Sequence, residues 1–479
     1  MNKIRELEWV CWHKRKRTPF FVSCWTEGLA RPRRALDKFD YSIKHIGHFD
    51  DNVIMSKNDF DAKKELLRRG HGQDTRFIYN LIQDYYEHYS EALQEWEAIH
   101  AEKELNNKTN EKLAVLIEKY FESMARKCSL IMIFLFLEDE LIKEAESELK
   151  KHFAGERWKE ASDILLNQTK KSITQKERLS ILKISEKIKE KKCFDVELDQ
   201  HITDFSWMRN QLFTGDYFPQ EHYIKNAKEY VGRDIEELIK EEEEEHNKKL
   251  REIEEYMKNI ECDSKLTALI ETIQELIYFR NFRAERLYQS SFYVQPLLSE
   301  ISRRFGVSDK DIVYLTPREI MELLRKGKKP VNREIESRKE GFSLLTNINN
   351  GQVISGKKLK EIKENVNFEP SGKLLKGQAT YQGKARGSVV IINNQNDLTK
   401  IKKGDILVTH MTTPAFAMAL DKVSGIVTEE GGLLCHATTL SREFKIPCII
   451  GTKTATKILK DGDIIELDSK KGEVRKTGD

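Results

Sequence analysis

The chain has few residues that break or cross-link a polypeptide. Only 9 of its 479 residues are proline, and its 7 cysteines are scattered at positions 11, 24, 128, 193, 262, 435 and 448. No two cysteines have the C-x-x-C spacing of a zinc or redox site, and an odd number does not suit a disulfide framework. We therefore expect reduced thiols, no metal site and a cytoplasmic location.

The sequence also lacks long apolar runs and an excess of one charge. No stretch approaches the roughly 18 apolar residues of a membrane helix, and the charged N-terminus has no apolar signal core. The 82 basic and 79 acidic residues leave a net charge of +3. The composition therefore indicates neither nucleic acid nor a membrane as a partner. With 34% charged and 39% hydrophobic residues, it favours a soluble, helix-rich protein of two to three domains.

Helical periodicity dominates residues 1–345, which we expect to form a large all-α domain. Within one predicted helix, apolar residues recur at i, i+3, i+4, i+7 and i+8 from Leu113 to Phe121. Residues 311–315 predict a short strand, followed by a helix with a capping box between Thr316 and Glu319. The longer helices are expected over residues 58–104, 108–153, 157–170, 174–191, 223–259 and 263–304.

The pattern changes after residue 345. Residues 346–376 are rich in Asn, Lys, Gly and Glu and lose periodicity, which predicts a flexible connector. In residues 377–479, short apolar runs alternate with short helical segments and turn signals. These residues predict a compact α/β domain. Its strands are expected near residues 388–392, 406–410, 423–428 and 447–451, with two more around turns at 461–462 and 471–472.

One stretch of this domain carries a chemical motif. An apolar run over residues 423–427 leads to Gly431-Gly432, and His436 then stands at the start of a predicted helix. Free backbone N–H groups and the helix dipole favour negative charge at that position. An imidazole with the ordinary pKa of ~6.5 is mostly neutral at pH 7 and can attack phosphorus. We expect His436 to carry a phosphoryl group; the alternatives are a structural histidine and a domain that has lost its chemistry.

The residues around His436 match a family pattern. The pattern is Thr-x-x-Gly-Gly-x-x-Cys-His-Ala over residues 428–437, then Arg-Glu and Ile-Pro over 442–447. Upstream, residues 383–387 and Thr-Thr-Pro at 412–414 also match. The last ~100 residues thereby resemble the swivelling phosphohistidine domain of phosphoenolpyruvate (PEP)-utilising enzymes, which include PEP synthase, pyruvate phosphate dikinase and rifampin phosphotransferase. The resemblance implies a compact β/β/α domain in which His436 is phosphorylated and Thr428 orients its imidazole.

Four neighbours of His436 are expected to bind the phosphate. Gly431 and Gly432 keep the approach free of side chains, and the hydroxyls of Thr438 and Thr439 lie within one helical turn. Cys435 and His410 are expected to have structural roles.

Charged residues farther from His436 are weaker candidates. Arg442 and Glu443 lie nearly two turns later, so we expect docking or structural roles, with direct phosphate binding by Arg442 as an alternative. Arg280, Arg283 and Arg286, spaced i, i+3, i+6, predict either a basic face for an anionic substrate or for the phospho-domain, or a solvated face.

Two aromatic groups predict either the lining of a small-molecule pocket or, as we favour, ordinary helical core. They are Trp9, Trp12, Phe20, Phe21 and Trp25, and then His201, Phe205, Trp207 and Arg209.

The first ~340 residues resemble, more loosely, the helical region that precedes the swivelling domain in rifampin phosphotransferase and PEP synthase-like proteins. We expect neither the ATP-grasp domain nor the PEP-binding TIM barrel of those enzymes in this chain. The resemblance then implies that a separate ATP-grasp partner, holding ATP and magnesium, phosphorylates His436. The group would pass to a small-molecule acceptor in the helical domain. The alternatives are a non-catalytic interaction or regulatory protein that keeps the domain for docking, and an enzyme with another phosphodonor.

Overall fold

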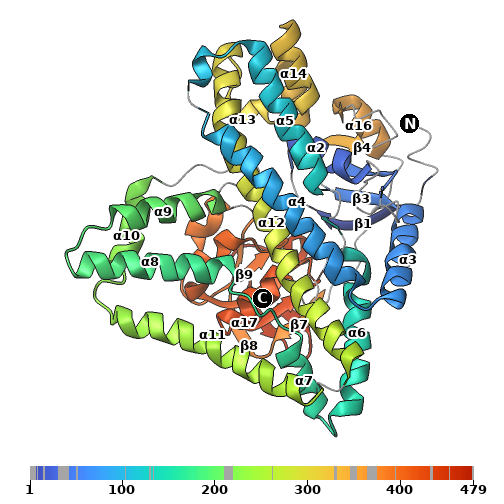
Figure 1. Ribbon diagram of the computed structural model, residues 1–479, viewed down its shortest axis with the longest axis vertical. Coiled ribbons are helices and arrows are strands. Elements are labelled where there is room, and N and C mark those ends of the chain that lie inside the picture. Colours follow the sequence, from blue (N-terminus) through green and yellow to red (C-terminus); the bar gives the residue numbers. More distant parts are fainter. Residues whose placement is uncertain are drawn as a thin grey trace. The chain divides into compact units, whose positions relative to one another are not determined.

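The computed structural model describes most of the chain (Figure 1). The described residues are 7, 9–14, 17–30, 42–49, 52–102, 104–128, 131–132, 134–209, 219–260, 263–327, 332–345, 353–363, 375–393, 395–431, 435–452 and 454–476.

Two compact units make up the fold, and each is assembled from stretches that are not contiguous in sequence. Unit 1 comprises Met1–Leu137, Leu212–Thr214 and Arg286–Glu369. Unit 2 comprises Glu138–Gln211, Gly215–Glu285 and Pro370–Asp479. Helices α6 (Phe134–His152) and α12 (Ser264–Phe305) each have residues in both units. The predicted domain boundaries at residues 345 and 376 remain a prediction.

Unit 1 contains an antiparallel sheet that the sequence reading missed. Its five strands follow the order β1-β3-β2-β4-β5. The prediction of an all-α region over residues 1–345 is therefore wrong. The strands have only two to six residues. Strand β4 pairs with β2 although nearly 300 residues separate them. No local sequence pattern therefore predicts this sheet. The strands are β1 (Trp9–Lys14), β2 (Ile46–Phe49), β3 (Asn52–Ser56), β4 (Phe342–Leu345) and β5 (Ile354–Ser355).

Helices form the rest of the described part of unit 1. The apolar stripe predicted on α5 is confirmed, because Leu113, Ile117 and Phe121 are buried, and α5 packs against α2, α4 and α14. Phe20, Phe21 and Trp25 are buried on α2. The helices are α2 (Pro19–Ala30), α3 (Lys57–Gln73), α4 (Phe77–His100), η2 (Leu105–Asn107), α5 (Asn110–Cys128), α13 (Asp309–Ile312), α14 (Pro317–Lys326), α15 (Asn332–Glu340) and α16 (Gly356–Lys363).

Two local predictions in unit 1 have opposite outcomes. The capping box at the start of α14 is confirmed, with Thr316 and Glu319 each bonded to the other's backbone N–H. The strand predicted over residues 311–315 is wrong, because α13 already occupies Asp309–Ile312.

Residues of the expected connector form β5 and α16, and Leu359 and Ile362 join the core under the sheet. Residues 346–352 and 364–374 of that segment lie outside the described residues.

The helical part of unit 2 is drawn in green to yellow-green in Figure 1. Helix α8 packs against α10 and α11, and α7 packs against α11. The single helix predicted over residues 223–259 is two helices, because Asp234 caps a new start by accepting a hydrogen bond from the backbone N–H of Glu237. The elements are α7 (Arg157–Leu165), α8 (Ile173–Lys189), α9 (Asp195–Phe205), η3 (Ser206–Arg209), α10 (Gln220–Lys228) and α11 (Ile235–Lys258).

The C-terminal sheet domain (residues 375–476) completes unit 2. Its sheet has the strand order β6-β13-β12-β8-β9-β10-β11-β7. The four strands from β8 to β11 run parallel, and antiparallel strands flank them. The predicted strands and the helix start at His436 are confirmed. The elements are β6 (Leu375–Lys376), β7 (Gln378–Tyr381), β8 (Lys384–Ile391), η4 (Gln395–Lys400), β9 (Asp405–Thr409), η5 (Pro414–Lys422), β10 (Val423–Thr428), α17 (His436–Glu443), β11 (Cys448–Ile450), α18 (Ala455–Ile458), β12 (Ile464–Asp468) and β13 (Glu473–Lys476).

Successive side chains of the parallel strands point to opposite faces of this sheet, and each face has its own hydrophobic core. Leu407 and Ile426 face η5 and α17, whereas Val408 and Val427 face α18 and the antiparallel strands. Residues two apart along a strand share a face, so strands buried on both sides read as continuous apolar runs. Burial on both faces fixes the register of β9 and β10, whose ends position the site.

Candidate functional site

His436 is the first residue of α17, close to the ends of two parallel strands. Strand β10 ends at Thr428 and its neighbour β9 at Thr409, directly opposite. Cys435 precedes the helix in extended conformation (φ −74°, ψ 164°) as its N-cap. His436 is half-buried, and the first N–H groups of an α-helix have no intrahelical acceptor.

The imidazole of His436 is held by a threonine. The Oγ1 atom of Thr412, in the loop after β9, lies 3.0 Å from His436 Nδ1. Burial lowers the pKa of His436 to about 3, so the ring is neutral throughout the physiological range. In the tautomer in which Nδ1 donates to Thr412 Oγ1, the neutral ring presents a lone pair on Nε2. That arrangement is the one required of a nucleophile.

Thr412, and not Thr428, makes the contact with the His436 ring in this structure, and the predicted role of Thr428 in orienting the imidazole remains a prediction. Thr428 is fully buried at the end of β10, and its hydroxyl donates to the carbonyl of Glu430. Its own carbonyl accepts hydrogen bonds from the N–H and the hydroxyl of Thr452. Thr428 therefore organises the loop that leads to α17. The signal for Thr412 was the Thr-Thr-Pro motif, whose role is visible only when β9 and β10 are placed side by side.

The glycine pair has one member within the described residues. Gly431 has φ +138°, a conformation that residues with a side chain rarely adopt. A Cβ atom there would lie 2.7 Å from Cys435 Sγ and 3.2 Å from Ile450 Cβ. Gly431 thus lets the loop turn tightly against the start of α17. Gly432 lies outside the described residues.

The two threonines on α17 have protein partners. Thr438 is buried, and its Oγ1 lies 3.4 Å from Sγ of the buried Cys435. The hydroxyl of Thr439 accepts a hydrogen bond of 3.2 Å from Nδ2 of Asn281 on α12. In this arrangement both hydroxyls contribute to packing around α17, and their phosphate-binding roles remain predictions.

A contact between a histidine and a buried carboxylate lies just after the same two strands. His410 Nδ1 lies 2.6 Å from Glu429 Oε2, and the Glu429 side chain is almost fully buried. Burial raises the pKa of Glu429, but the hydrogen bonds from His410 and from Thr456 outweigh it and hold the pKa below its usual value. Since Thr456 donates through both its N–H and its hydroxyl, the cluster fastens the ends of β9 and β10 to α18.

The arginines predicted to form one basic face on α12 have different contacts. Arg280 Nη1 lies 2.8 Å from Oε2 of the buried Glu138 in unit 2. Arg286, in unit 1, donates to Gln289 and lies over the ring of Tyr89. Arg283 is half-buried between them on α12.

The second aromatic group belongs to the helical part of unit 2. His201 is buried against Phe205 and Tyr223, and burial lowers its pKa to about 4. Trp207 is also buried, whereas the side chains of Trp12 and Arg209 lie outside the described residues.

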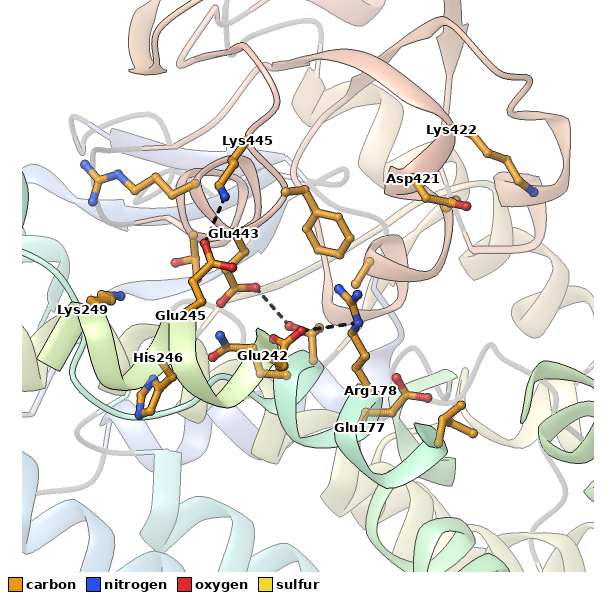
Figure 2. Close-up of a pocket in the computed structure, with 18 of the residues that line it drawn as sticks. Glu177, Arg178, Glu242, Glu245, His246, Lys249, Asp421, Lys422, Glu443 and Lys445 are labelled. Atoms are coloured by element: carbon orange, nitrogen blue, oxygen red, sulfur yellow. Dashed lines mark hydrogen bonds and ion pairs between the residues drawn. The ribbon is translucent and has the colours of Figure 1, made fainter. Parts of the chain in front are cut away.

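A cavity of about 1120 Å³ opens within unit 2. Helices α7, α8, α10 and α11 line one side of it, and η4, η5 and α17 line the other. Figure 2 shows Glu242, Glu245, His246 and Lys249 on α11, with Glu245 joined to Lys445 across the cavity. Thr439, Arg442 and Glu443 of α17 also line it, so the helix that begins at His436 forms part of its wall.

Glu443, which lines this cavity, is expected to make the stability of unit 2 depend on pH. Burial raises the pKa of Glu443 to about 7, above the 4.5 of a free glutamate, and the Thr174 hydroxyl donates to its Oε2. The folded state therefore keeps a proton that the unfolded state loses between pH 4.5 and 7. Stability falls as pH rises through that window, and the full penalty is present above it.

Replacing Glu443 by glutamine is expected to remove this penalty. The variant should be more stable than the wild type by roughly 1–3 kcal/mol at pH 8 and equal to it near pH 4.5. Urea unfolding at both pH values measures the difference. Glu241→Gln, at an exposed position of α11, is the matched control and should respond equally at both. A Glu443→Gln protein less stable at pH 8 than the wild type would contradict the assignment.

Known proteins match the C-terminal part of the chain. Residues 401–472 match the family described as PEP-utilising enzyme, mobile domain. A probable phosphoenolpyruvate synthase of Archaeoglobus fulgidus is 47% identical over 117 residues, which are 24% of this chain and 16% of that protein. The phosphoenolpyruvate synthase of Pyrococcus furiosus is 46% identical over 103 residues, 22% of this chain and 13% of that protein.

A third relative matches a longer part of the chain. The rifampicin phosphotransferase of Bacillus cereus is 30% identical over 220 residues, 42% of this chain and 24% of that protein. The matched part of the chain thus spans less than a quarter of each of these relatives. A solved structure, the holo-form of aconitase X from Thermococcus kodakaraensis, matches 22% of this chain and all of its own, at 19% identity, with a TM-score of 0.18, too low to indicate a shared fold.

Among the described residues, no helix is both long and apolar enough to cross a membrane. The described site has His436 at the start of α17, within the region that the family and its phosphotransferase-named members match. Residues 401–472 of this chain therefore carry a mobile domain of the PEP-utilising enzyme family.

Proposed function

We propose that the chain is a phosphocarrier in which His436 accepts a phosphoryl group and passes it to a small-molecule acceptor. The observation that carries this proposal is the neutral, half-buried imidazole at the start of α17, fixed through Nδ1 by Thr412. Because Nδ1 is engaged, Nε2 is the atom that attacks phosphorus. The new N–P bond forms as the donor's bond to the same phosphorus breaks, and it places the phosphate beside the N–H groups of the first turn, which have no intrahelical acceptor.

The donor is proposed to be a nucleotide bound with magnesium by a separate ATP-grasp protein. The relatives are named phosphoenolpyruvate synthase and rifampicin phosphotransferase, and the second name describes transfer of a phosphoryl group. Swivelling of the C-terminal sheet domain would carry the group from the donor to the acceptor. A tethered carrier makes the second transfer effectively intramolecular.

A non-catalytic role is the second candidate. Thr439, Glu443 and Lys445 hold α17 against the helices of unit 2 through Asn281, Thr174 and Glu245. These contacts favour a protein that uses the domain for docking. The two functions differ in one respect, because only the phosphocarrier forms a phosphoramidate on His436.

The test is phosphorylation of the purified chain by two routes. In the first, ATP labelled at the β or γ position is added with and without a candidate ATP-grasp protein. In the second, phosphoramidate serves as a chemical donor and needs no partner. We expect acid-labile, alkali-stable label by both routes. Absence of label from both would reject the phosphocarrier, and labelling by ATP without the partner would reject the need for a partner.

Thr412→Val is expected to slow phosphorylation by phosphoramidate about 10- to 100-fold, as loss of an outer-sphere partner of a functional histidine often does. Valine keeps the shape of threonine but cannot accept the Nδ1 proton, so the ring is no longer held in its nucleophilic tautomer. Thr412→Ser should restore most of the rate. Initial rates of label incorporation measure the effect. A serine variant as slow as the valine variant would indicate that only packing was lost.

A further inference from the structure

One wall of the cavity in unit 2 contains a cation without a carboxylate partner. Arg442 is half-buried on α17, and burial lowers its pKa, although a guanidinium remains charged in proteins. Among the described residues, no carboxylate lies within ion-pair distance of it, and Asp163 attracts it only from farther away. A charge removed from water without a partner is costly, so this arrangement favours an anion from outside.

Lys249 on α11 is a second cation at the same end of the cavity. Its Nζ donates to Asn167 Oδ1 at 3.0 Å. Burial lowers the pKa of Lys249 to about 8; the charge of Glu443 opposes this shift and the charge of Arg442 adds to it, so Lys249 stays mostly protonated at neutral pH. The influence of Arg442 on this pKa indicates that the two cations lie near each other.

The nearby carboxylates do not neutralise this pair. Glu245 is engaged with Lys445 at 3.2 Å. Burial raises the pKa of Glu443 to about 7, so it carries only part of a charge at neutral pH. His246 adds no negative charge. Among the described residues, neither Arg442 nor Lys249 forms an ion pair, so both cations of this cavity wall have donors available for an anionic group.

The cavity also extends along the helix that begins with His436. Positions 436, 439 and 443 share one face of an α-helix because of its 3.6-residue period. Both Thr439 and Glu443 line the cavity, and His436 lies one turn before Thr439. A volume of about 1120 Å³ suits a small molecule much larger than a single anion.

We propose that this end of the cavity binds the carboxylate or phosphate group of a small molecule through Arg442 and Lys249, and that this molecule is the phosphoryl acceptor. The second half rests on the proposed function. The ligand's anionic group anchors it at the end of α17, and its remainder extends along the helix toward His436. In the transfer, the acceptor's hydroxyl oxygen bonds to phosphorus as the N–P bond to His436 breaks, and the hydroxyl proton passes to the released imidazole. The acceptor class is therefore an anionic hydroxy compound rather than an apolar one.

Binding is tested in the full chain carrying His436→Ala, which removes phosphoryl transfer from the measurement. Calorimetric titrations use glycerol 3-phosphate, glycerate and uncharged glycerol as probes. We expect the two anions to bind and glycerol not to bind. Arg442→Gln should weaken anion binding roughly 10-fold or more, as loss of a charged hydrogen bond does. The matched control is Arg475→Gln, an exposed arginine of the same domain paired with Glu473; it should leave binding unchanged.

Lys249→Met provides a second variant should Arg442→Gln fail to fold, and it should also weaken binding. Equal affinity in the Arg442 and Arg475 variants, equal binding of glycerol, or no binding of either anion would overturn the site.

The acceptor role has its own measurement in the phosphorylated wild-type chain. Glycerol 3-phosphate should accelerate loss of label from His436 relative to inorganic phosphate, which has an anionic group but no carbon-bound hydroxyl. If the anions bind but do not accelerate loss of label, the acceptor role is overturned and the anion-binding site still stands. Failure of the chain to become phosphorylated would reject the proposed function, whereas the binding titrations would still decide the site.

Discussion

Replacing His436 by alanine is expected to abolish phosphorylation of the chain. The variant lacks the only atom proposed to attack phosphorus, Nε2, while Thr412 and the start of α17 remain in place. Label incorporated from phosphoramidate or from the partner should fall by roughly 10⁴-fold or more, as when an essential nucleophile is removed. Acid-labile label measured on the intact protein, followed by peptide mapping, provides the readout.

His88→Ala is the matched control for this variant. His88 lies on α4 in unit 1, beside Asp84 and Glu91, so its loss should leave labelling unchanged. Acid-labile label that persists in the His436→Ala protein at the wild-type rate would place the phosphoryl group on another residue. The circular dichroism of both variants should match that of the wild type, because alanine favours the helical conformation at either position.

Replacing Gly431 by alanine is expected to destabilise unit 2 by roughly 2–4 kcal/mol, because it adds crowding to backbone strain. Its φ of +138° disfavours any side chain, and the new methyl group would lie 2.7 Å from Cys435 Sγ. Relief of that contact would shift Cys435, which caps α17. We therefore expect slower labelling of His436 as well, measured alongside the urea unfolding midpoint.

Gly462→Ala separates strain from crowding. Gly462 also has a positive φ of +88°, but a Cβ atom there meets nothing within 4 Å. The control should lose only the backbone contribution of roughly 1–2 kcal/mol and should be phosphorylated at the normal rate. Equal losses of stability in the two variants would show that the contact with Cys435 contributes nothing.

The features that local sequence specifies were predicted correctly. The start of α17 at His436, the capping box of α14 and the apolar strands of the C-terminal sheet domain each depend on residues a few positions apart. Turn residues, caps and apolar periodicity act over that range. They are sufficient to identify a mostly helical chain, a C-terminal sheet and the histidine at the start of α17.

Features that depend on distant residues were not predicted. The pairing of β2 with β4 joins residues nearly 300 positions apart, and strands of four residues carry little pattern of their own. The contact of Thr412 with His436 requires β9 and β10 to be neighbours. The cavity brings Lys249 close to Arg442 and Glu443, almost 200 residues later. Burial and charge at these positions are properties of the folded chain and have no local signature.

The strand order of the C-terminal sheet has a consequence for synthesis on the ribosome. Strand β12 lies between β8 and β13, so β8, made some 75 residues earlier, has an unpaired edge until residues 464–468 emerge. An exposed edge of this kind readily pairs with other chains. A truncation that removes residues 464–468 would leave this edge unpaired and is therefore expected to reduce soluble yield, although His436 itself would still be present.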